Sequence, residues 1–173
     1  NFSTVSITSG NNVTLVDTNA IDLGASTVSG ALNVTTAGAI TDSGTLAVTG
    51  TTTLAAGSGN NITLDSAANN FSTVALTSGN NVTLVDTNAI DLGTSTVSGT
   101  LNVTAGGAIT DSGTLAATGT MTLAAGSGNN ITLDSAANNF STVAITSGNN
   151  VTLADTNTLD LGASTVSGNL NVM

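Results

Sequence analysis

Aspartate is the only residue type in this sequence whose side chain could do acid-base or metal chemistry. The 173 residues include ten Asp and no Lys, Arg, His, Cys or Tyr. Asp alone would have no partner to orient or activate it. The catalytic arrangement that Asp alone could still form is a pair of carboxylates flanking a sugar bond, as in enzymes that cleave polysaccharides. Asp17 with Asp22 is the best candidate pair. The pair occurs again as Asp86 with Asp91 and as Asp155 with Asp160. Because an active site is usually built once, we predict that the chain is not an enzyme.

A second set of Asp residues recurs at a regular spacing along the chain. Its members are Asp17, Asp42, Asp65, Asp86, Asp111, Asp134 and Asp155. One carboxylate per turn along a single edge would suit calcium, which prefers oxygen ligands. The glycine-rich nonapeptide calcium repeat is absent, and Asp is also an ordinary corner residue. A calcium-stabilised repeat is therefore kept as an alternative, and no catalytic, cofactor-binding or metal-ligating residue is assigned.

The charge and composition of the chain exclude several classes of partner. The net charge is -10, so binding to nucleic acid or to an anionic membrane, which relies on Lys and Arg, is not expected. No apolar stretch approaches the roughly 20 residues of a membrane helix. Hydrophobic residues make up 39% of the chain and recur in register, which disfavours disorder. No signal-like segment opens the sequence, and we expect it to be a piece of a longer protein.

The chain is organised by a long internal repeat. The stretch SGNNVTLVDTNAIDLG at 9–24 returns unchanged at 78–93 and almost letter for letter at 147–162. Residues 1–69 match 70–138 without a gap and differ at eight positions, and 139–173 repeat the first half again. We therefore expect one continuous domain with two full copies and one partial copy.

Within a copy the apolar residues stand in pairs two apart, which is the period of a strand with one buried face. The pairs are Val5/Ile7, Val13/Leu15, Ile21/Leu23, Leu32/Val34, Leu46/Val48, Thr52/Leu54 and Ile62/Leu64, with Ile40 and Phe71 as single positions. This predicts nine short strands per copy. Thr52 is assigned to the inside because its counterpart is Met121. Gly and Asn between the pairs predict corners.

The spacing of the Asp set indicates a shorter repeat inside each copy. The intervals from Asp17 through Asp42 and Asp65 to Asp86 predict three turns per copy, with about 23 residues per turn, and fixed periods of this size are typical of solenoids. Helical periodicity is absent, and short strands separated by corners favour stacked parallel strands about 4.8 Å apart. The fold class predicted is all-β, a right-handed parallel β-helix (β-solenoid).

Two further readings concern the surface of such a rod. Thr14, Thr41 and Thr63 recur as single outward residues, so a face for ice would be narrow. A carbohydrate face would need aromatic platforms, and the three Phe at 2, 71 and 140 are expected inside. A ligand-binding face for ice or carbohydrate is kept as an alternative. Asn-x-Thr triplets at 12–14, 33–35 and 61–63 formally read as glycosylation acceptors, but the corner-to-strand transition explains them more simply.

The runs LNVTTAGAITDSGTLAVTGTTTLAAGSGNNITL at 32–64 and TLNVTAGGAITDSGTLAATGTMTLAAGSGNNITL at 100–133 resemble the repeat region of filamentous-haemagglutinin-type exoproteins, which are large bacterial surface adhesins. The resemblance covers essentially the whole chain. It implies a right-handed parallel β-helix secreted by a Gram-negative bacterium to the extracellular space or the cell surface. The function implied is a structural shaft or fibre segment, such as an adhesin stalk.

The partners expected on this basis are structural. The rod would associate end to end with copies of itself or continue within a longer chain. Contact with a host cell or a neighbouring cell would use modules that this sequence lacks. No cofactor, nucleic acid or membrane insertion is expected.

Overall fold

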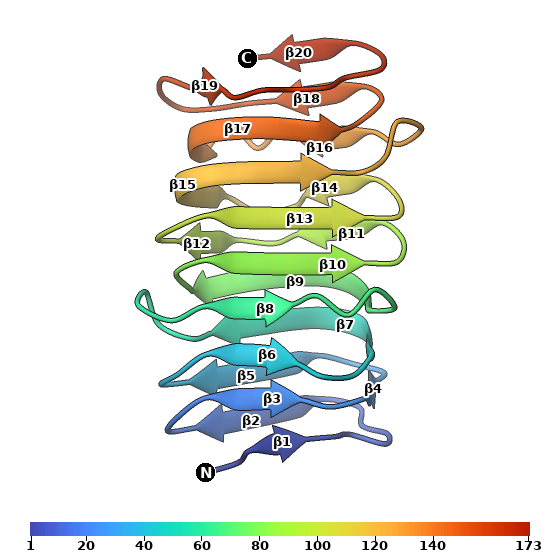
Figure 1. Ribbon diagram of the computed structural model, residues 1–173, viewed down its shortest axis with the longest axis vertical. Helices are drawn as coiled ribbons and strands as arrows, with labels where there is room; N and C mark the ends of the chain where they lie inside the picture. Colours follow the sequence, from blue (N-terminus) through green and yellow to red (C-terminus); the bar gives the residue numbers. More distant parts are fainter.

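The computed structural model describes residues 1–173 and contains twenty β-strands and no helix. The chain winds upward as a right-handed parallel β-helix of about eight turns, with its two termini at opposite ends of a rod (Figure 1). The predicted fold class is confirmed. No helix long and apolar enough to cross a membrane is present.

The rod has two parallel sheets of ten strands each, called here the front and rear sheets after the side on which most of their strands stand in Figure 1. Two three-residue strands, β4 (Ser26–Val28) and β12 (Ser95–Val97), stand at the right and left of the rod and are assigned to the sheets by their pairing. The front sheet contains β1 (Thr4–Val5), β3 (Ile21–Leu23), β6 (Ile40–Asp42), β8 (Ile62–Leu64), β10 (Val82–Asp86), β12 (Ser95–Val97), β13 (Leu101–Ala105), β15 (Leu115–Ala124), β17 (Asn139–Ser147) and β19 (Asp160–Leu161). The rear sheet contains β2 (Val13–Asp17), β4 (Ser26–Val28), β5 (Leu32–Thr36), β7 (Leu46–Ala55), β9 (Asn70–Ser78), β11 (Ile90–Leu92), β14 (Ile109–Asp111), β16 (Ile131–Leu133), β18 (Val151–Leu153) and β20 (Leu170–Val172). Each turn therefore adds a rung to both sheets.

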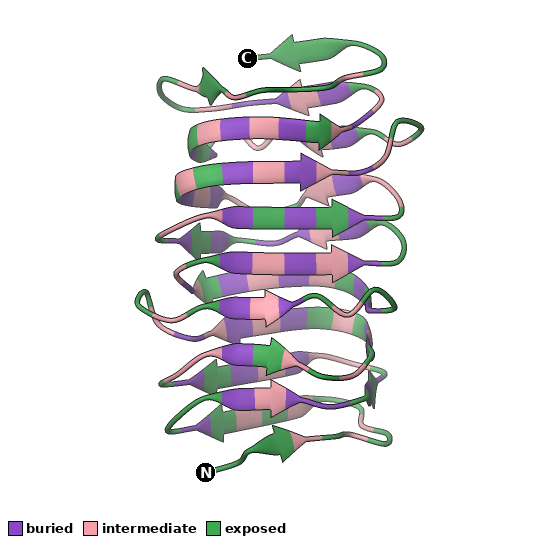
Figure 2. Ribbon diagram, viewed as in Figure 1, coloured by how far each residue is buried: buried purple, intermediate pink, exposed green.

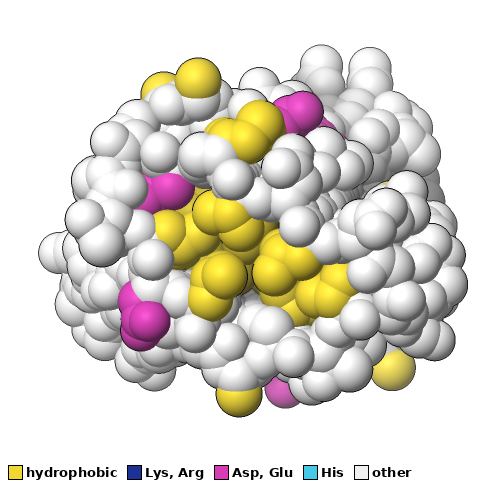
Figure 3. All heavy atoms as spheres, turned by 90° about the horizontal axis from the view of Figure 1, so that it is seen from above, with side chains coloured by type: hydrophobic (Ala, Val, Ile, Leu, Met, Phe, Trp, Pro, Cys, Tyr) yellow, Lys and Arg dark blue, Asp and Glu magenta, His cyan; other side chains and the backbone are white.

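Alternation along each strand divides the chain into one core and one polar shell. Buried and more exposed positions alternate along β10, β13 and β15 (Figure 2). The inward residues form a single cluster of 36 buried hydrophobic side chains, and Figure 3 shows apolar atoms at the centre of the end-on view. Burying a Leu or Ile stabilises the fold by about 1.5–3 kcal/mol relative to exposure. The core thus continues from turn to turn, with no break that would divide the rod into domains.

The register stacks like residues on like. Ile21 pairs with Ile40, Ile40 with Ile62, and Ile62 with Val82. At the corners, the Asn61 side-chain oxygen accepts from the Asn81 backbone N–H at 3.2 Å and from its amide group at 3.4 Å. The same contacts join Asn130 to Asn150. Corner Asn residues therefore bond along the rod axis, where loops would otherwise leave amides unpaired.

Most turns are shorter than predicted. The length of a turn is the number of residues between a residue and its partner in the next turn. Thr4 pairs with Asp22 and Ile21 pairs with Ile40, so these turns are shorter than the predicted length of about 23 residues, which is reached only at pairings such as Ala47 with Asn70. One copy consequently spans three and a half turns rather than three. Three rungs lead from β3 to β10 in the front sheet, and the counterpart of β3 is β11, half a turn further on in the rear sheet.

The half turn sets the symmetry of the rod. Val13 lies in β2 of the rear sheet, whereas its counterpart Val82 lies in β10 of the front sheet. The same exchange relates β7 to β15 and β9 to β17. Successive copies are therefore related by a half rotation about the axis together with a shift along it, and they present equivalent residues on opposite sides of the rod.

The strand bounds differ from the prediction at three places, and residues 70–138 form eight strands instead of the nine predicted per copy. Phe71 shares one strand, β9, with Val74 and Leu76. Leu46/Val48 and Thr52/Leu54 belong to one ten-residue strand, β7, because the chain continues through Gly50. A Cβ at Gly50 would stand 2.5 Å from the Gly30 carbonyl oxygen, so only glycine allows this approach. Strand β4 was not predicted. Its inward Ser26 is polar, but its hydroxyl donates to the Gly24 carbonyl at 2.8 Å and accepts from the Ile7 N–H at 3.0 Å.

The expected inward placement of Phe is confirmed at two of three positions. Phe71 and Phe140 are 1% and 2% exposed. Phe2 is 45% exposed, because β1 forms the first rung of its sheet and no strand pairs with it from below.

Thr52 is buried as predicted, and its hydroxyl has no hydrogen-bond partner. An unpaired buried hydroxyl costs about 1–3 kcal/mol. Thr52→Val keeps the side-chain shape and removes this cost, so it should raise the free energy of unfolding by about 1 kcal/mol in urea titrations followed by circular dichroism. The outward neighbour Thr53 is the matched control, since Thr53→Val should change it by less than about 0.5 kcal/mol. A loss of stability in Thr52→Val would contradict the conclusion that the buried Thr52 hydroxyl has no hydrogen-bond partner.

Candidate functional site

The candidate catalytic pair Asp17 and Asp22 does not form one site. Asp17 ends β2 in the rear sheet, and Asp22 is the middle residue of β3 in the front sheet. Asp17 is buried and accepts from the backbone N–H groups of Phe2 at 2.9 Å and Thr18 at 2.7 Å. Asp22 is turned to the outer face and accepts from the hydroxyls of Thr41 and Ser43. The two carboxylates have separate sets of partners.

Two opposing effects act on the pKa of Asp17. Burial raises it, whereas the amides of Phe2, Thr18 and Asn19 and the N-terminal ammonium lower it, and the net direction is a pKa below the ordinary value. The ammonium nitrogen is 3.7 Å from Oδ1. Because the folded pKa is lowered, ionised Asp17 contributes stability above its ordinary pKa, and this contribution is lost as the pH falls through the folded pKa.

The regular Asp set does not follow one edge. It falls into three parts, with Asp17 in the rear sheet, Asp42, Asp65 and Asp86 at or just after the ends of front strands, and Asp111, Asp134 and Asp155 at or just after the ends of rear strands. The expected ladder of one carboxylate per turn is therefore interrupted and changes sides, because a copy spans a half-integral number of turns. No group of three or more acidic side chains gathers in a geometry that could hold a metal ion.

Asp42 belongs to a buried clasp that the sequence did not reveal. Its Oδ2 accepts from the side-chain amide of Asn69 at 2.6 Å, and its Oδ1 accepts from the Asp65 N–H at 2.9 Å. The Asn69 side-chain oxygen accepts from the Leu46 N–H at 2.8 Å, and Asn69 is fully buried. Asp111, Asn138 and Leu115 repeat the clasp in the next copy. This carboxylate therefore fastens neighbouring turns together.

The outward-facing carboxylate of each copy accepts hydrogen bonds from hydroxyl groups. Asp91 accepts from Thr73 at 3.1 Å, from Thr110 at 3.2 Å and from Ser112. These donors come from the turns below and above it. Asp91 is thus a rung in a column of polar side chains, and neutral donors on both sides fix its orientation.

The Thr residues considered for ice binding form short single columns. Thr41 pairs with Thr63, which pairs with Thr83, in the front sheet. Thr14 lies in the rear sheet and pairs with Asn33 instead. The rear sheet holds the equivalent column of Thr110, Thr132 and Thr152. Each column is one residue wide on its face, in agreement with the narrow surface expected.

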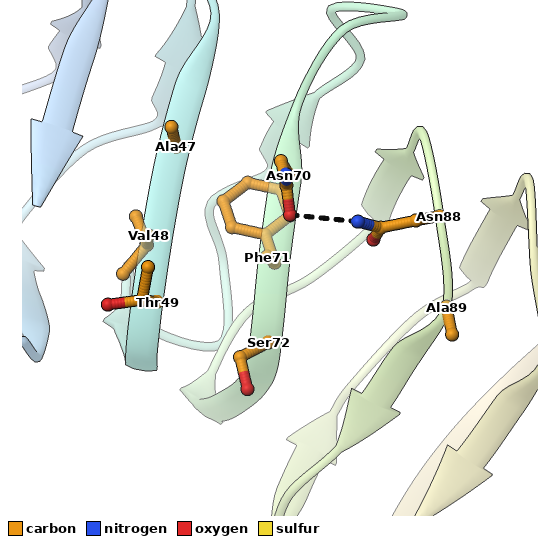
Figure 4. A pocket seen from close by; sticks show the side chains of 8 residues that line it. All are labelled: Ala47, Val48, Thr49, Asn70, Phe71, Ser72, Asn88 and Ala89. Atoms are coloured by element: carbon orange, nitrogen blue, oxygen red, sulfur yellow. Dashed lines mark hydrogen bonds between the residues drawn. The ribbon is translucent and has the colours of Figure 1, made fainter. Parts of the chain in front are cut away.

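A shallow hollow recurs where one copy meets the next. At the junction of the first and second copies it has a volume of about 460 Å³ and is lined by Ala47, Val48, Thr49, Asn70, Phe71, Ser72, Asn88 and Ala89 (Figure 4). The counterparts at the junction of the second and third copies line a hollow of about 370 Å³. At the rim of the first hollow, the Asn88 side-chain amide donates a hydrogen bond to the Asn70 side-chain oxygen at 3.1 Å. The lining of this hollow is uncharged and contains amides, hydroxyls and apolar groups but no acid or base.

The hollow arises from the pairing of β7 with β9. Val48 pairs with Phe71, but the next pair is Thr51 with Thr73, so β7 carries an extra residue in the interval. The strand bulges there and leaves the space beside Asn70. β15 and β17 show the same shift between Ala117 and Thr120. Because the copies differ by a half turn, the two hollows open on opposite sides of the rod.

Comparison with known proteins identifies the repeat but no activity. A family described as "Repeats of unknown function (DUF5649)" matches three consecutive stretches, 10–78, 79–147 and 148–173. The first two stretches have the same length as the copies seen in the sequence. No curated protein and no solved structure matches the chain. Since the matched stretches cover nearly all of the sequence, the chain belongs to this family of repeats of unknown function.

Proposed function

We propose that this chain is a shaft segment of a secreted bacterial surface protein, which extends or displays other modules as an adhesin stalk or extracellular filament does. The observation that carries the proposal is the uninterrupted core, which runs from Ile21 to Leu153 inside two continuous parallel sheets. A rod of this kind transmits force through backbone hydrogen bonds along its axis. The setting proposed is the cell surface of a Gram-negative bacterium, as the sequence resemblance implies.

The placement of the polar groups supports a structural role. Asp17, Asp42 and Asp91 each accept hydrogen bonds from neighbouring turns or corners. These carboxylates therefore hold the coil together, and none has a Lys, Arg, His, Cys or Tyr side chain beside it. We accordingly propose that the shaft has no enzymatic activity and needs no cofactor.

The exposed apolar residues at the last turn support continuation of the coil. Leu161, Leu170 and Val172 are 42%, 42% and 44% exposed. Strand β20 is the counterpart of β5 and β13, and both of these pair with a ten-residue strand in the following turn. We propose that a strand of this type covers β20 in the parent fibre, supplied by the same chain or by a copy stacked end to end.

An extended chain tests the proposal. Residues 105–138 are appended after Met173→Thr, which restores the sequence of a complete copy. The extension should raise the melting temperature, bury Leu170 and protect the β20 amides from hydrogen exchange, and X-ray scattering should show a longer rod of unchanged cross-section. A scrambled extension of equal composition is the control. If the extension stayed disordered, or stabilised the chain no more than the scrambled one, the proposal that this chain is a shaft segment would be refuted.

A further inference from the structure

One carboxylate in the middle of the rod has a different environment from its two counterparts. Asp86 ends β10 and is 3% exposed. Its Oδ1 accepts from the Phe71 N–H at 3.2 Å, but its Oδ2 has no hydrogen-bond partner. A buried carboxylate oxygen without a donor is costly when the group is ionised and much less so when it is protonated.

The counterparts do not have this defect. At Asp17, Oδ2 accepts from Phe2 at 2.9 Å and Oδ1 accepts from Thr18 at 2.7 Å. At Asp155, Oδ1 accepts from Phe140 at 2.8 Å and Oδ2 accepts from the Asn157 N–H at 3.3 Å. The unsatisfied oxygen is thus specific to the middle copy.

No neighbouring element supplies a compensating positive charge to Asp86. In the turn above, β13 places Ala105 in register with it. In the turn below, β8 is followed by Asp65, and on the β9 side Asn69 binds Asp42. The charged groups around Asp86 are therefore carboxylates, in a chain with no Lys, Arg or His.

We propose that Asp86 is a proton-operated lock, which holds β9 and β10 together most tightly when its carboxyl group is neutral. Burial acts in the same direction and raises the pKa of Asp86 above its ordinary value of 3.8, although the amides of Phe71, Thr87 and Asn88 oppose it. Below the pKa of the unfolded chain the carboxyl is protonated in both states. As the pH rises through the folded pKa, the folded chain must ionise a buried group and this stability is lost.

The lock acts at a junction of several turns. The Thr87 N–H donates to the Asn69 carbonyl at 2.8 Å, and the Phe71 N–H donates to Asp86 itself. Phe71 also lines the hollow between β7 and β9. Ionisation of Asp86 therefore makes this part of the rod easier to open at neutral pH, and mild acid closes it.

Native-state hydrogen exchange on the whole chain tests the lock at two pH values, about 4.5 and about 7. After correction for intrinsic exchange, the Phe71 and Thr87 amides should open less often in acid, by up to about tenfold for each unit by which the folded pKa exceeds the unfolded one. In Asp86→Asn, the Phe71 and Thr87 amides should open at both pH values as rarely as they do in the unsubstituted chain in acid. Asp155→Asn, the matched control, should keep the pH response at Phe71.

The carboxyl titration of the unsubstituted chain gives a second readout that does not depend on folding of the variants. In carbon-detected nuclear magnetic resonance, the Asp86 carboxyl should titrate above 3.8. A titration at or below that value would overturn the lock. The same conclusion would follow if Asp86→Asn retained the full pH dependence of opening at Phe71.

Discussion

Replacing Leu84 by Asp should abolish cooperative folding of the chain. Leu84 is fully buried in β10, between Leu64 below and Val103 above. An unpaired charge in this core has no donor within reach, and its burial costs several kcal/mol, which is comparable to the whole stability of a small domain. The measurement is urea unfolding followed by circular dichroism.

The repeat supplies a matched control for this substitution. Leu15 is the counterpart of Leu84, but it lies near the first turn and is only partly buried. Leu15→Asp should shift the unfolding midpoint less, because the charge can reach water. Equal effects at the two positions would show that the depth of the core does not decide the outcome.

The second large effect is expected at the buried clasp. Asn69→Ala removes the amide that binds Asp42 and the oxygen that accepts from the Leu46 N–H. The Leu46 N–H then loses its partner at a fully buried position, which costs about 1–3 kcal/mol. The half-buried Asp42 loses its shortest hydrogen bond, a charge-assisted one, and keeps those from Asp65 and Ser66. The free energy of unfolding should fall by about 2–5 kcal/mol, and the Leu46 amide should exchange faster.

Asn70 is the control one residue away. It is exposed, and its side chain bonds only to the exposed Asn88. Asn70→Ala should change the free energy of unfolding by less than about 0.5 kcal/mol. If the two variants lost the same stability, the clasp would not be a special feature of the rod.

The architecture and the orientation of most side chains follow from the order of the residues. Apolar pairs two residues apart can bury only one face of a strand, so the inward placement of Ile21, Leu64 and Phe71 follows from local periodicity. Thr52 was placed inside by its counterpart Met121 and is fully buried. The long repeat likewise follows from the letters alone, because near-identical segments fold into near-identical units.

The way in which the copies wind depends on contacts between strands that are far apart along the chain. The Asp intervals measure distance along the chain, whereas the turn length depends on which strands pair, and pairing follows the stack of Ile21, Ile40, Ile62 and Val82. Front and rear sheets have the same alternation, so no local pattern distinguishes three turns per copy from three and a half. Because each copy adds a half turn, the regular Asp set is divided between the two sheets and the two hollows open on opposite sides of the rod. The path of the chain around the rod also places Asp17 and Asp22 in different sheets.

Individual polar contacts were also beyond the reach of the sequence. Asn69 and Asn70 are adjacent and identical in type, yet one is fully buried and the other is exposed. Asp86 and Asp155 stand at the same position of the repeat, yet only Asp86 has an oxygen without a partner. These differences arise from the turns stacked above and below each residue, and those neighbours are far away along the chain, as Phe71 is from Asp86 and Asn69 is from Asp42.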